Sequence, residues 1–226
     1  MEKRISVNQF AEYSRAKTEK GKLSIIKRHK EPSDVDDIMK RWYRLAKSRM
    51  RKCLLSQGDL MPIYDGLETL QTQKPEGIMR QRNRKVSIEA LEEFLQIQLP
   101  GFITNGKLTP IKPNRKSLYL NGVSIFVSPE VVFKIKGEDG VEYLGCVKLH
   151  VSKKAFSFET SELVSAISYK YLKEIGEESG RIADPRYCIT IDVFGKRIVP
   201  APMNSNKLDH TIDFLCEEFV RLWSAA

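Results

Sequence analysis

The apolar positions in the first third of the chain recur at helical intervals. Ser33 or Asp34 is suited to begin a helix, because a short polar side chain caps the first turn and acids there face the positive end of the helix dipole. A helix from that point to near Gly58 would bury one face and present lysine and arginine on the other. The buried stripe would consist of Val35, Ile38, Met39, Trp42, Leu45, Ala46, Cys53 and Leu54.

Two shorter helices are predicted ahead of this one. Ser6 and Gln9 form a capping-box pattern, and Phe10 and Tyr13 supply a packing stripe to the helix that follows. The segment 22–30 is the second short helix, with only a few apolar anchors. The N-terminal part of the chain is therefore expected to be helical and basic.

The segment 59–85 has a high density of turn signals. It contains Gly-Asp, Met-Pro, Asp-Gly and Pro-Glu-Gly steps and ends in the basic run RQRNRK. We therefore predict a turn-rich linker over these residues. A new helix is expected to begin with Ser87 as its N-cap and to end near Gln98, before a Pro-Gly step.

From Lys116 onward the apolar period changes from helical to alternating. The segments SLYL and VSIFV flank Asn121-Gly122, a strong hairpin signal, and VVFKI and YLGCVKLHV flank a second turn at 137–140. These two consecutive hairpins predict a meander. A helix capped at Thr160 or Ser161 follows, then the strands YCITIDVF and RIVPAP, and finally an amphipathic helix over 207–226.

The predicted fold class is α+β. A basic helical N-terminal part precedes a helix, an antiparallel or mixed sheet of about five to six strands with a crossing helix, and a C-terminal helix. The expected domain organisation is a basic helical region over 1–58, a linker over 59–85 and an α/β core domain over 86–226.

Composition narrows the class of protein. The chain has 226 residues, of which 41% are hydrophobic, so it is long enough to bury a core. It contains no run of about 18 apolar residues and no export signal at its start, which predicts a cytoplasmic protein without a membrane partner. The four cysteines are widely separated and are expected to be free and buried.

The positive charge is concentrated at the start of the chain. Residues 1–85 hold 21 Lys and Arg against 11 Asp and Glu, whereas residues 86–226 hold 17 against 18. Such an asymmetry favours a polyanionic partner, DNA or RNA, although an acidic protein partner would also be attracted. The predicted nucleic-acid-binding residues are Lys40, Arg41, Arg44, Lys47, Arg51, Lys52, Arg80, Arg82, Arg84 and Lys85.

The second hairpin carries the candidate chemistry. In SPEVVFKI an acid, Glu130, opens one strand, and in YLGCVKLHV the next strand carries Cys146 and Lys148 two residues apart and hence on one face. With the order of residues 87–194, a helix, three or four antiparallel strands, a helix and a strand, this resembles the core of the PD-(D/E)XK nuclease superfamily. The resemblance implies Glu130 as the first acid, and Cys146 and Lys148 at the acid-x-lysine positions.

A cysteine in place of the second carboxylate changes what the site is expected to do. A thiol is a soft ligand and replaces a carboxylate poorly toward Mg²⁺ or Mn²⁺. Asp192, an acid inside an otherwise apolar strand, is the candidate replacement, with Glu89, Glu92 or Glu93 as other donors. The resemblance therefore implies Glu130, Lys148 and Asp192 as catalytic residues and Glu130 and Asp192 as metal ligands, in a site expected to be degenerate.

Each of these residues also has an ordinary structural interpretation. Lys148 would be a surface lysine, and Asp192 would form an ion pair with Lys196, Arg197 or Lys148. Two functional hypotheses follow: a nucleic-acid-associated protein with a nuclease-like core, or a protein-interaction or scaffold module of a larger assembly. The chain lacks a P-loop, a dinucleotide-binding glycine motif and a zincin motif, which leaves those chemistries without their minimal residues.

Overall fold

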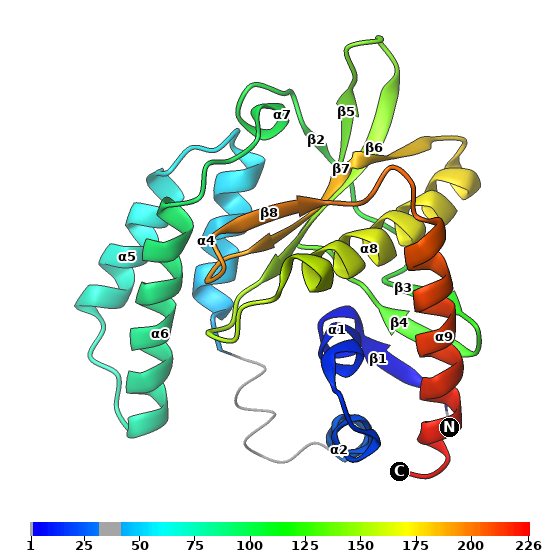
Figure 1. Cartoon of the computed structure of the whole chain (residues 1–226). Helices are drawn as coiled ribbons and strands as arrows, with labels where there is room; N and C mark the ends of the chain where they lie inside the picture. The colour runs from blue at the N-terminus through cyan, green and yellow to red at the C-terminus, as the bar shows by residue number, and fades with distance from the viewer. Residues whose placement is uncertain (1, 32–41) are drawn as a thin grey trace.

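The computed structural model describes residues 2–31 and 42–226 (Figure 1). The elements of the N-terminal half are β1 (Arg4–Ser6), α1 (Val7–Arg15), α2 (Glu19–Lys30), α4 (Arg44–Leu55), α5 (Met61–Thr72), α6 (Ile78–Leu95), α7 (Gly101–Thr104) and β2 (Thr109–Pro110). Those of the C-terminal half are β3 (Ser117–Leu120), β4 (Val123–Phe126), β5 (Val131–Lys136), β6 (Glu142–His150), α8 (Phe158–Ser179), β7 (Ile182–Asp192), β8 (Arg197–Pro200) and α9 (Asn206–Trp223).

A five-stranded mixed sheet, in the order β2-β5-β6-β7-β8, forms the centre of the fold. Strands β5 and β6 are an antiparallel hairpin, β6 and β7 are parallel, and β7 and β8 are antiparallel. The parallel step needs a crossover connection, which α8 provides. Helix α8 covers one face of this sheet, and α4, α5 and α6 lie beyond the other (Figure 1). The expected α+β class with a crossing helix and a C-terminal helix is confirmed.

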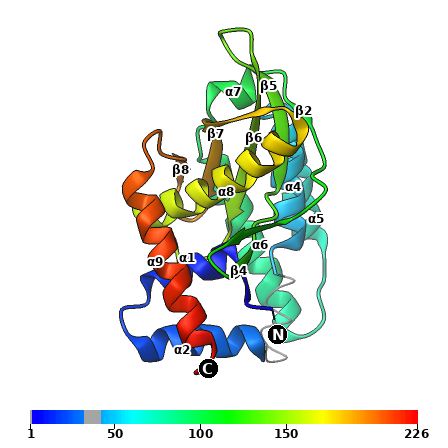
Figure 2. The ribbon, with the colours of Figure 1, turned by 90° about the vertical axis from the view of Figure 1, so that its right-hand side faces the viewer.

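The first strand and the first two helices pack against the C-terminal half of the chain. Strand β1 pairs in parallel with β4, in a small sheet of order β1-β4-β3. Helices α1 and α2 lie beside α8 and α9, as both views show (Figures 1 and 2). Residues 1–58, expected as one basic helical region, therefore contribute to two different sides of the molecule.

Two hydrophobic cores correspond to the two faces of the five-stranded sheet. On one face Cys146 of β6 and Cys188 of β7 pack with α1, α8 and α9, together with the small sheet. On the other face Val147 and Leu149 of β6 pack with Ile189 and Ile191 of β7 and with α4, α5 and α6. Strand β6 is thus buried on both sides, which explains the nearly continuous apolar run of its sequence.

Local capping signals in the sequence are used as expected at two places. The Ser6 hydroxyl accepts the backbone N–H of Gln9 at 3.3 Å and starts α1. Asn121 and Gly122 have φ angles of 42° and 81° and close the β3–β4 hairpin, as an Asn-Gly turn of this kind requires. Helix α8, in contrast, is capped by Ser157 and not by Thr160 or Ser161.

The long helix expected from Ser33 or Asp34 differs from the structure. Its first residues lie outside the described part of the chain, and α4 begins only at Arg44. Tyr43, directly before it, has a φ of 60°, which a residue inside a right-handed helix cannot adopt. Trp42 accordingly lies in a turn and is half-buried, not part of a helical stripe.

The expected linker over 59–85 contains α5 and the first part of α6. The turn signals mark only its ends, with Pro62 in the first turn of α5 and Gly77 at a φ of 84° before α6. The run RQRNRK is helical because arginine, lysine and glutamine are good helix formers. Ser87, expected as an N-cap, is buried inside α6.

The two hairpins do not form a meander, because they belong to different sheets. Between β4 and β5 the chain turns at Ser128, whose φ is 37°, and Pro129 follows. Glu130 directly follows this turn and directly precedes β5, so the turn determines where the Glu130 side chain lies.

The four cysteines are free and buried, as expected. Burial raises the pKa of the Cys53 thiol to about 11 and that of Cys216 to about 12. Within residues 2–31 and 42–226, no helix combines the length and the apolar character that a membrane span needs.

Candidate functional site

Glu130 and Lys148 meet at one end of the β5–β6 hairpin. A carboxylate oxygen of Glu130 lies 3.6 Å from the Lys148 ammonium nitrogen, and both side chains are largely buried. The same oxygen, Oε2, accepts the backbone N–H of Leu149 at 2.8 Å. The Lys148 ammonium also donates to the carbonyl of Ser128 at 3.0 Å. The pairing of first acid and lysine that the sequence suggested is therefore present as an ion pair.

Helix α4 adds positive charge to this pair. The Lys47 ammonium lies 3.9 Å from the other oxygen of Glu130, and the Arg51 guanidinium donates to the Glu130 backbone carbonyl at 2.8 Å. Burial lowers the pKa of Lys47, with Lys148 adding to this effect and Glu130 opposing it. The Glu130 carboxylate thus lies near two ammonium groups, and Arg51 binds the backbone carbonyl of the same residue.

Asp192 has a different role at the end of β7. One of its carboxylate oxygens accepts the backbone N–H of Phe156 at 2.8 Å and the other accepts that of Gly195 at 3.3 Å. Its side chain is fully buried, and burial raises the pKa of its carboxyl group. Asp192 therefore ties the loop after β6 to the β7–β8 turn, and its hydrogen bonds go to backbone groups.

The position where the nuclease motif has its second carboxylate lies in the core. Cys146 is fully buried on β6 and faces Cys188, its register partner on β7. Burial, with the neighbouring Cys146 thiol, raises the pKa of Cys188 well above its ordinary value. A thiol pair packed under α8 leaves no acid at the second motif position.

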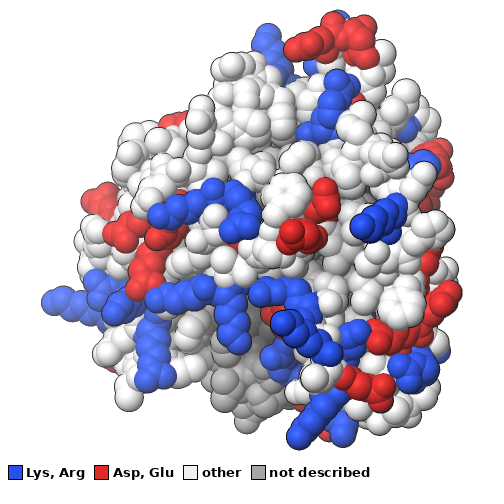
Figure 3. All heavy atoms as spheres, viewed as in Figure 1, with Lys and Arg blue, Asp and Glu red and all other residues white. Residues whose placement is uncertain are grey.

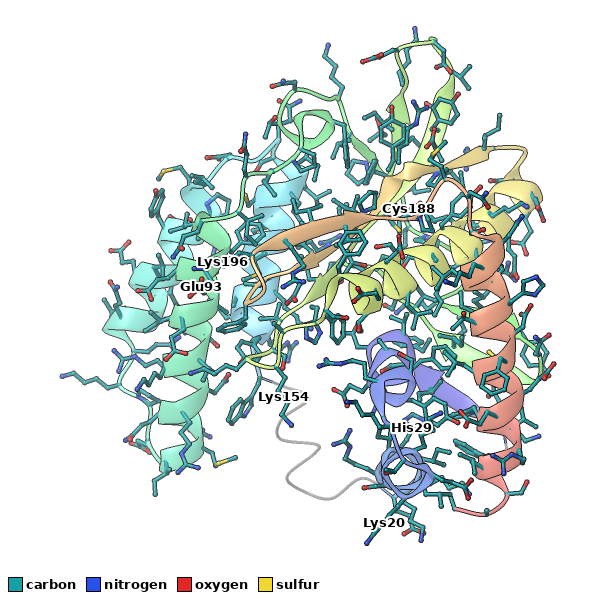
Figure 4. All side chains as sticks on the ribbon, viewed as in Figure 1. Lys20, His29, Glu93, Lys154, Cys188 and Lys196 are labelled. Carbon is teal, nitrogen blue, oxygen red and sulfur yellow. The ribbon has the colours of Figure 1, made fainter. Side chains whose placement is uncertain are left out.

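The other donors considered for a replacement carboxylate are engaged elsewhere on α6. Glu89 pairs with Lys153 at 2.5 Å, and Glu93 pairs with Lys196 of the β7–β8 turn at 2.9 Å (Figure 4). Glu92 is exposed on the same helix.

The described residues do not fit a magnesium or manganese site. No group of three or more His, Cys, Asp or Glu side chains that would hold a metal ion occurs among residues 2–31 and 42–226. A hard divalent cation needs several oxygen ligands, and Glu130 offers one carboxylate already surrounded by cations.

His150 closes the same end of β6. Its ring stacks on Phe156 with centroids 3.4 Å apart, and its Nε2 lies 3.0 Å from the Lys154 carbonyl, to which it donates in the neutral form. Burial lowers the pKa of His150 to about 4, and the nearby Lys47 contributes in the same direction. This histidine is a neutral core group at physiological pH.

A groove of about 960 Å³ opens beyond this end of β6, and we call it the Lys154 groove. Its lining includes five basic residues and one acidic residue, with three aromatic side chains at its walls. The basic residues are Arg15, Arg28, Lys47, Lys153 and Lys154. The acid is Glu12, and the aromatic residues are Trp42, Tyr43 and Phe156.

The basic residues of this groove are only partly neutralised. Arg28 pairs with Glu12 at 2.9 Å and Lys153 pairs with Glu89, but the ammonium group of Lys154 makes no ion pair within the described part of the chain. Lys154 projects from the loop between β6 and α8 (Figure 4). In the space-filling view, drawn from the same side as Figure 1, Lys and Arg side chains form a band across the lower half of the molecule (Figure 3).

The ten basic residues predicted from the sequence divide into four sets. Lys40 and Arg41 lie outside the described residues. Lys47 and Arg51 contact Glu130. Arg82 and Lys85 are exposed on α6. The remaining four, Arg44, Lys52, Arg80 and Arg84, line a second groove between α4 and α6.

Sequence reasoning missed most of the Lys154 groove. Arg15 and Arg28 come from helices that appear unremarkable in the sequence, and only the fold brings them to β6. Lys153 and Lys154 had a usable signal, because they follow directly after a buried strand. Loops at the carboxyl ends of parallel strands are a common place for binding sites.

Comparison with known proteins adds no further constraint on this site. No protein-family model matches the chain, and no curated protein sequence matches it.

Proposed function

We propose that this protein binds nucleic acid, DNA or RNA, through the Lys154 groove, and that its nuclease-like core serves as a scaffold without metal-dependent cleavage. The observation that carries the proposal is the described lining of the groove, which has five basic residues and one acid, and in which Arg15 and Lys154 form no ion pair with a described residue. Lysine and arginine side chains bind a polyanion by releasing its condensed counterions.

The aromatic residues of the groove support the same proposal. Trp42 and Tyr43 are half-buried at its wall, so part of each ring is accessible. Nucleic-acid grooves commonly combine basic side chains for the backbone with aromatic rings for stacking on bases.

The positions of Glu130 and Lys148 support the nuclease-like part of the proposal. Glu130 precedes β5 and Lys148 lies on its hairpin partner β6, as the resemblance to PD-(D/E)XK requires of the first acid and the lysine. The absence of fit to a metal among the described residues supports a binding role in place of a catalytic one.

Fluorescence anisotropy with labelled single-stranded DNA, duplex DNA and RNA, between 50 and 200 mM salt, tests the proposal. Lys154→Glu should weaken binding and flatten its salt dependence, because this lysine makes no ion pair with a described residue. The matched control is Lys136→Glu, an exposed lysine at the far end of β5.

Two results would contradict the proposal. The first is that the parent protein binds none of the three nucleic acids. The second is that Lys154→Glu binds nucleic acid as tightly as the control variant does. Retention of one stoichiometric acidic protein at high salt, without nucleic-acid binding, would favour the alternative role as a protein-interaction module.

A further inference from the structure

The second groove, which we call the α4–α6 groove, has a lining of one charge sign. It measures about 630 Å³ and is lined by Arg44, Arg49, Lys52, Arg80 and Arg84. None of the described residues along it is acidic. Five like charges around one cavity repel each other, so an anion bound between them would stabilise the arrangement.

The fold holds two of these guanidinium groups in place. Arg84 donates to the carbonyls of Leu70 and Gln71, where α5 ends, at 2.5 and 2.9 Å. Arg49 lies 3.9 Å from Asp65 on α5. The positive potential of the groove is therefore built into the packing of the three helices.

Other basic groups of the groove have no such structural role. The side chains of Arg44, Lys52 and Arg80 are exposed and form no hydrogen bond or ion pair with any described residue. Arginine presents several donors in a planar fork that matches the oxygens of a phosphate. These groups are available to a ligand, and arginine favours a phosphate ligand.

The α4–α6 groove and the Lys154 groove share one wall. The backbone N–H of Tyr43, which lines the Lys154 groove, donates to the Asn83 side chain, which lines the α4–α6 groove, at 3.2 Å. On α6, Val86 faces one groove and Ser87 the other. The band of Lys and Arg in Figure 3 runs from the side of α6 to the loop after β6.

We infer that the α4–α6 groove is a second phosphate-binding site, which holds the backbone of the same nucleic acid that occupies the Lys154 groove. This inference rests on the proposed function and adds a separate contact to it. The ligand crosses the wall between Tyr43 and Asn83, so that the two grooves contact successive parts of one strand.

The test uses the double variant Arg44→Gln with Arg80→Gln in the full chain. Neither side chain forms a hydrogen bond or ion pair with a described residue, so the melting temperature should stay close to that of the parent. The matched control is Arg181→Gln, an exposed arginine before β7, at the end of the β6–β7 pair opposite to His150. Arg84 is not used, because its removal would also uncap α5.

Binding of a labelled oligonucleotide is measured by anisotropy as a function of salt. The double variant should lose about tenfold in affinity for each lost contact at 50 mM salt, and the salt slope should fall by about two. Arg181→Gln should match the parent. A parent-like slope in the folded double variant would overturn the inference, and the proposed function would stand if Lys154→Glu still weakened binding.

A second titration with pyrophosphate distinguishes a nucleic-acid backbone from a small phosphate ligand. Saturable pyrophosphate binding that the double variant loses, together with an unchanged oligonucleotide slope, would overturn the inference and identify the groove as a site for a small phosphate compound. Failure of the parent to bind any oligonucleotide would overturn the proposed function and this inference with it.

Discussion

The Glu130 carboxylate and the Lys148 ammonium group face each other across the end of the β5–β6 hairpin, with oxygen and nitrogen 3.6 Å apart. Both side chains are shielded from water, with exposed fractions of 15% and 10%. A charge in such a place is stable only while its partner is present. The pair is therefore a structural requirement of this end of the sheet, whatever else it does.

Replacing Glu130 by alanine should lower the free energy of unfolding by about 3 kcal/mol, because Lys148 would be left buried without its carboxylate. The control is Glu142→Ala on the same hairpin, whose pairing with Lys134 at 2.8 Å is more exposed. That change should cost less than about 1 kcal/mol. Urea unfolding of both variants measures the difference, and equal losses would contradict the prediction.

Introducing a carboxylate by Cys146→Glu should destabilise the protein and should not produce metal-dependent DNA cleavage. The new side chain would enter a fully buried position beside Cys188, where an unpaired carboxylate costs several kcal/mol. Urea unfolding with and without MgCl₂ provides the measurement. A gain of stability on adding Mg²⁺, or DNA cleavage, would show that the site accepts a metal after all.

Acidification should destabilise the protein through His150. Its pKa is lowered from 6.5 to about 4 in the folded state by burial and by the cations Lys47, Arg15 and Lys148. The unfolded chain therefore takes up a proton first, and stability falls by about 3 kcal/mol as the pH drops from about 6.5 to 4. The variant His150→Gln should lose this part of the pH dependence in urea unfolding. The same dependence in parent and variant would contradict the assignment.

Ser128 should prefer glycine over a branched residue. Its φ of 37° is in the left-handed region, and its carbonyl accepts the Lys148 ammonium. Ser128→Gly should leave stability unchanged within about 1 kcal/mol, whereas Ser128→Val should lower it by about 1 to 2 kcal/mol. Thermal unfolding compares the two, and a valine variant as stable as the glycine variant would refute the role of backbone strain.

The parts of the fold predicted correctly are those with a strong local signal. Ser6 begins α1 and Asn121-Gly122 closes a hairpin, because both devices depend on neighbouring residues only. The basic run after Gly77 was interpreted as a linker, although its side chains favour helix and Arg84 is fixed by contacts with α5. Helix propensity was therefore a usable local signal for that segment, and the contacts of Arg84 with α5 add to it.

The candidate site was predicted only in part. The opposition of Glu130 and Lys148 follows from hairpin register, which the sequence shows. The Asp192 carboxylate accepts hydrogen bonds from the backbone N–H groups of Phe156 and Gly195, and these bonds depend on the path of the loop after β6. Arg15 and Lys154 line the same groove because α1 packs beside α8. The hydrophobic periodicity of the sequence does not predict this packing.

The packing of β1, α1 and α2 on β4, α8 and α9 has a consequence for the protein during its synthesis. Residues such as Phe10, Tyr13 and Ile26 are synthesised before the rest of their core, which is completed only by Phe219 and Trp223, close to 200 residues later. Until α9 emerges, this apolar surface lacks part of its native cover, and contacts of such long sequence separation form slowly. The side chains of β1, α1 and α2 that belong to this core therefore stay partly uncovered until the last helix has been synthesised.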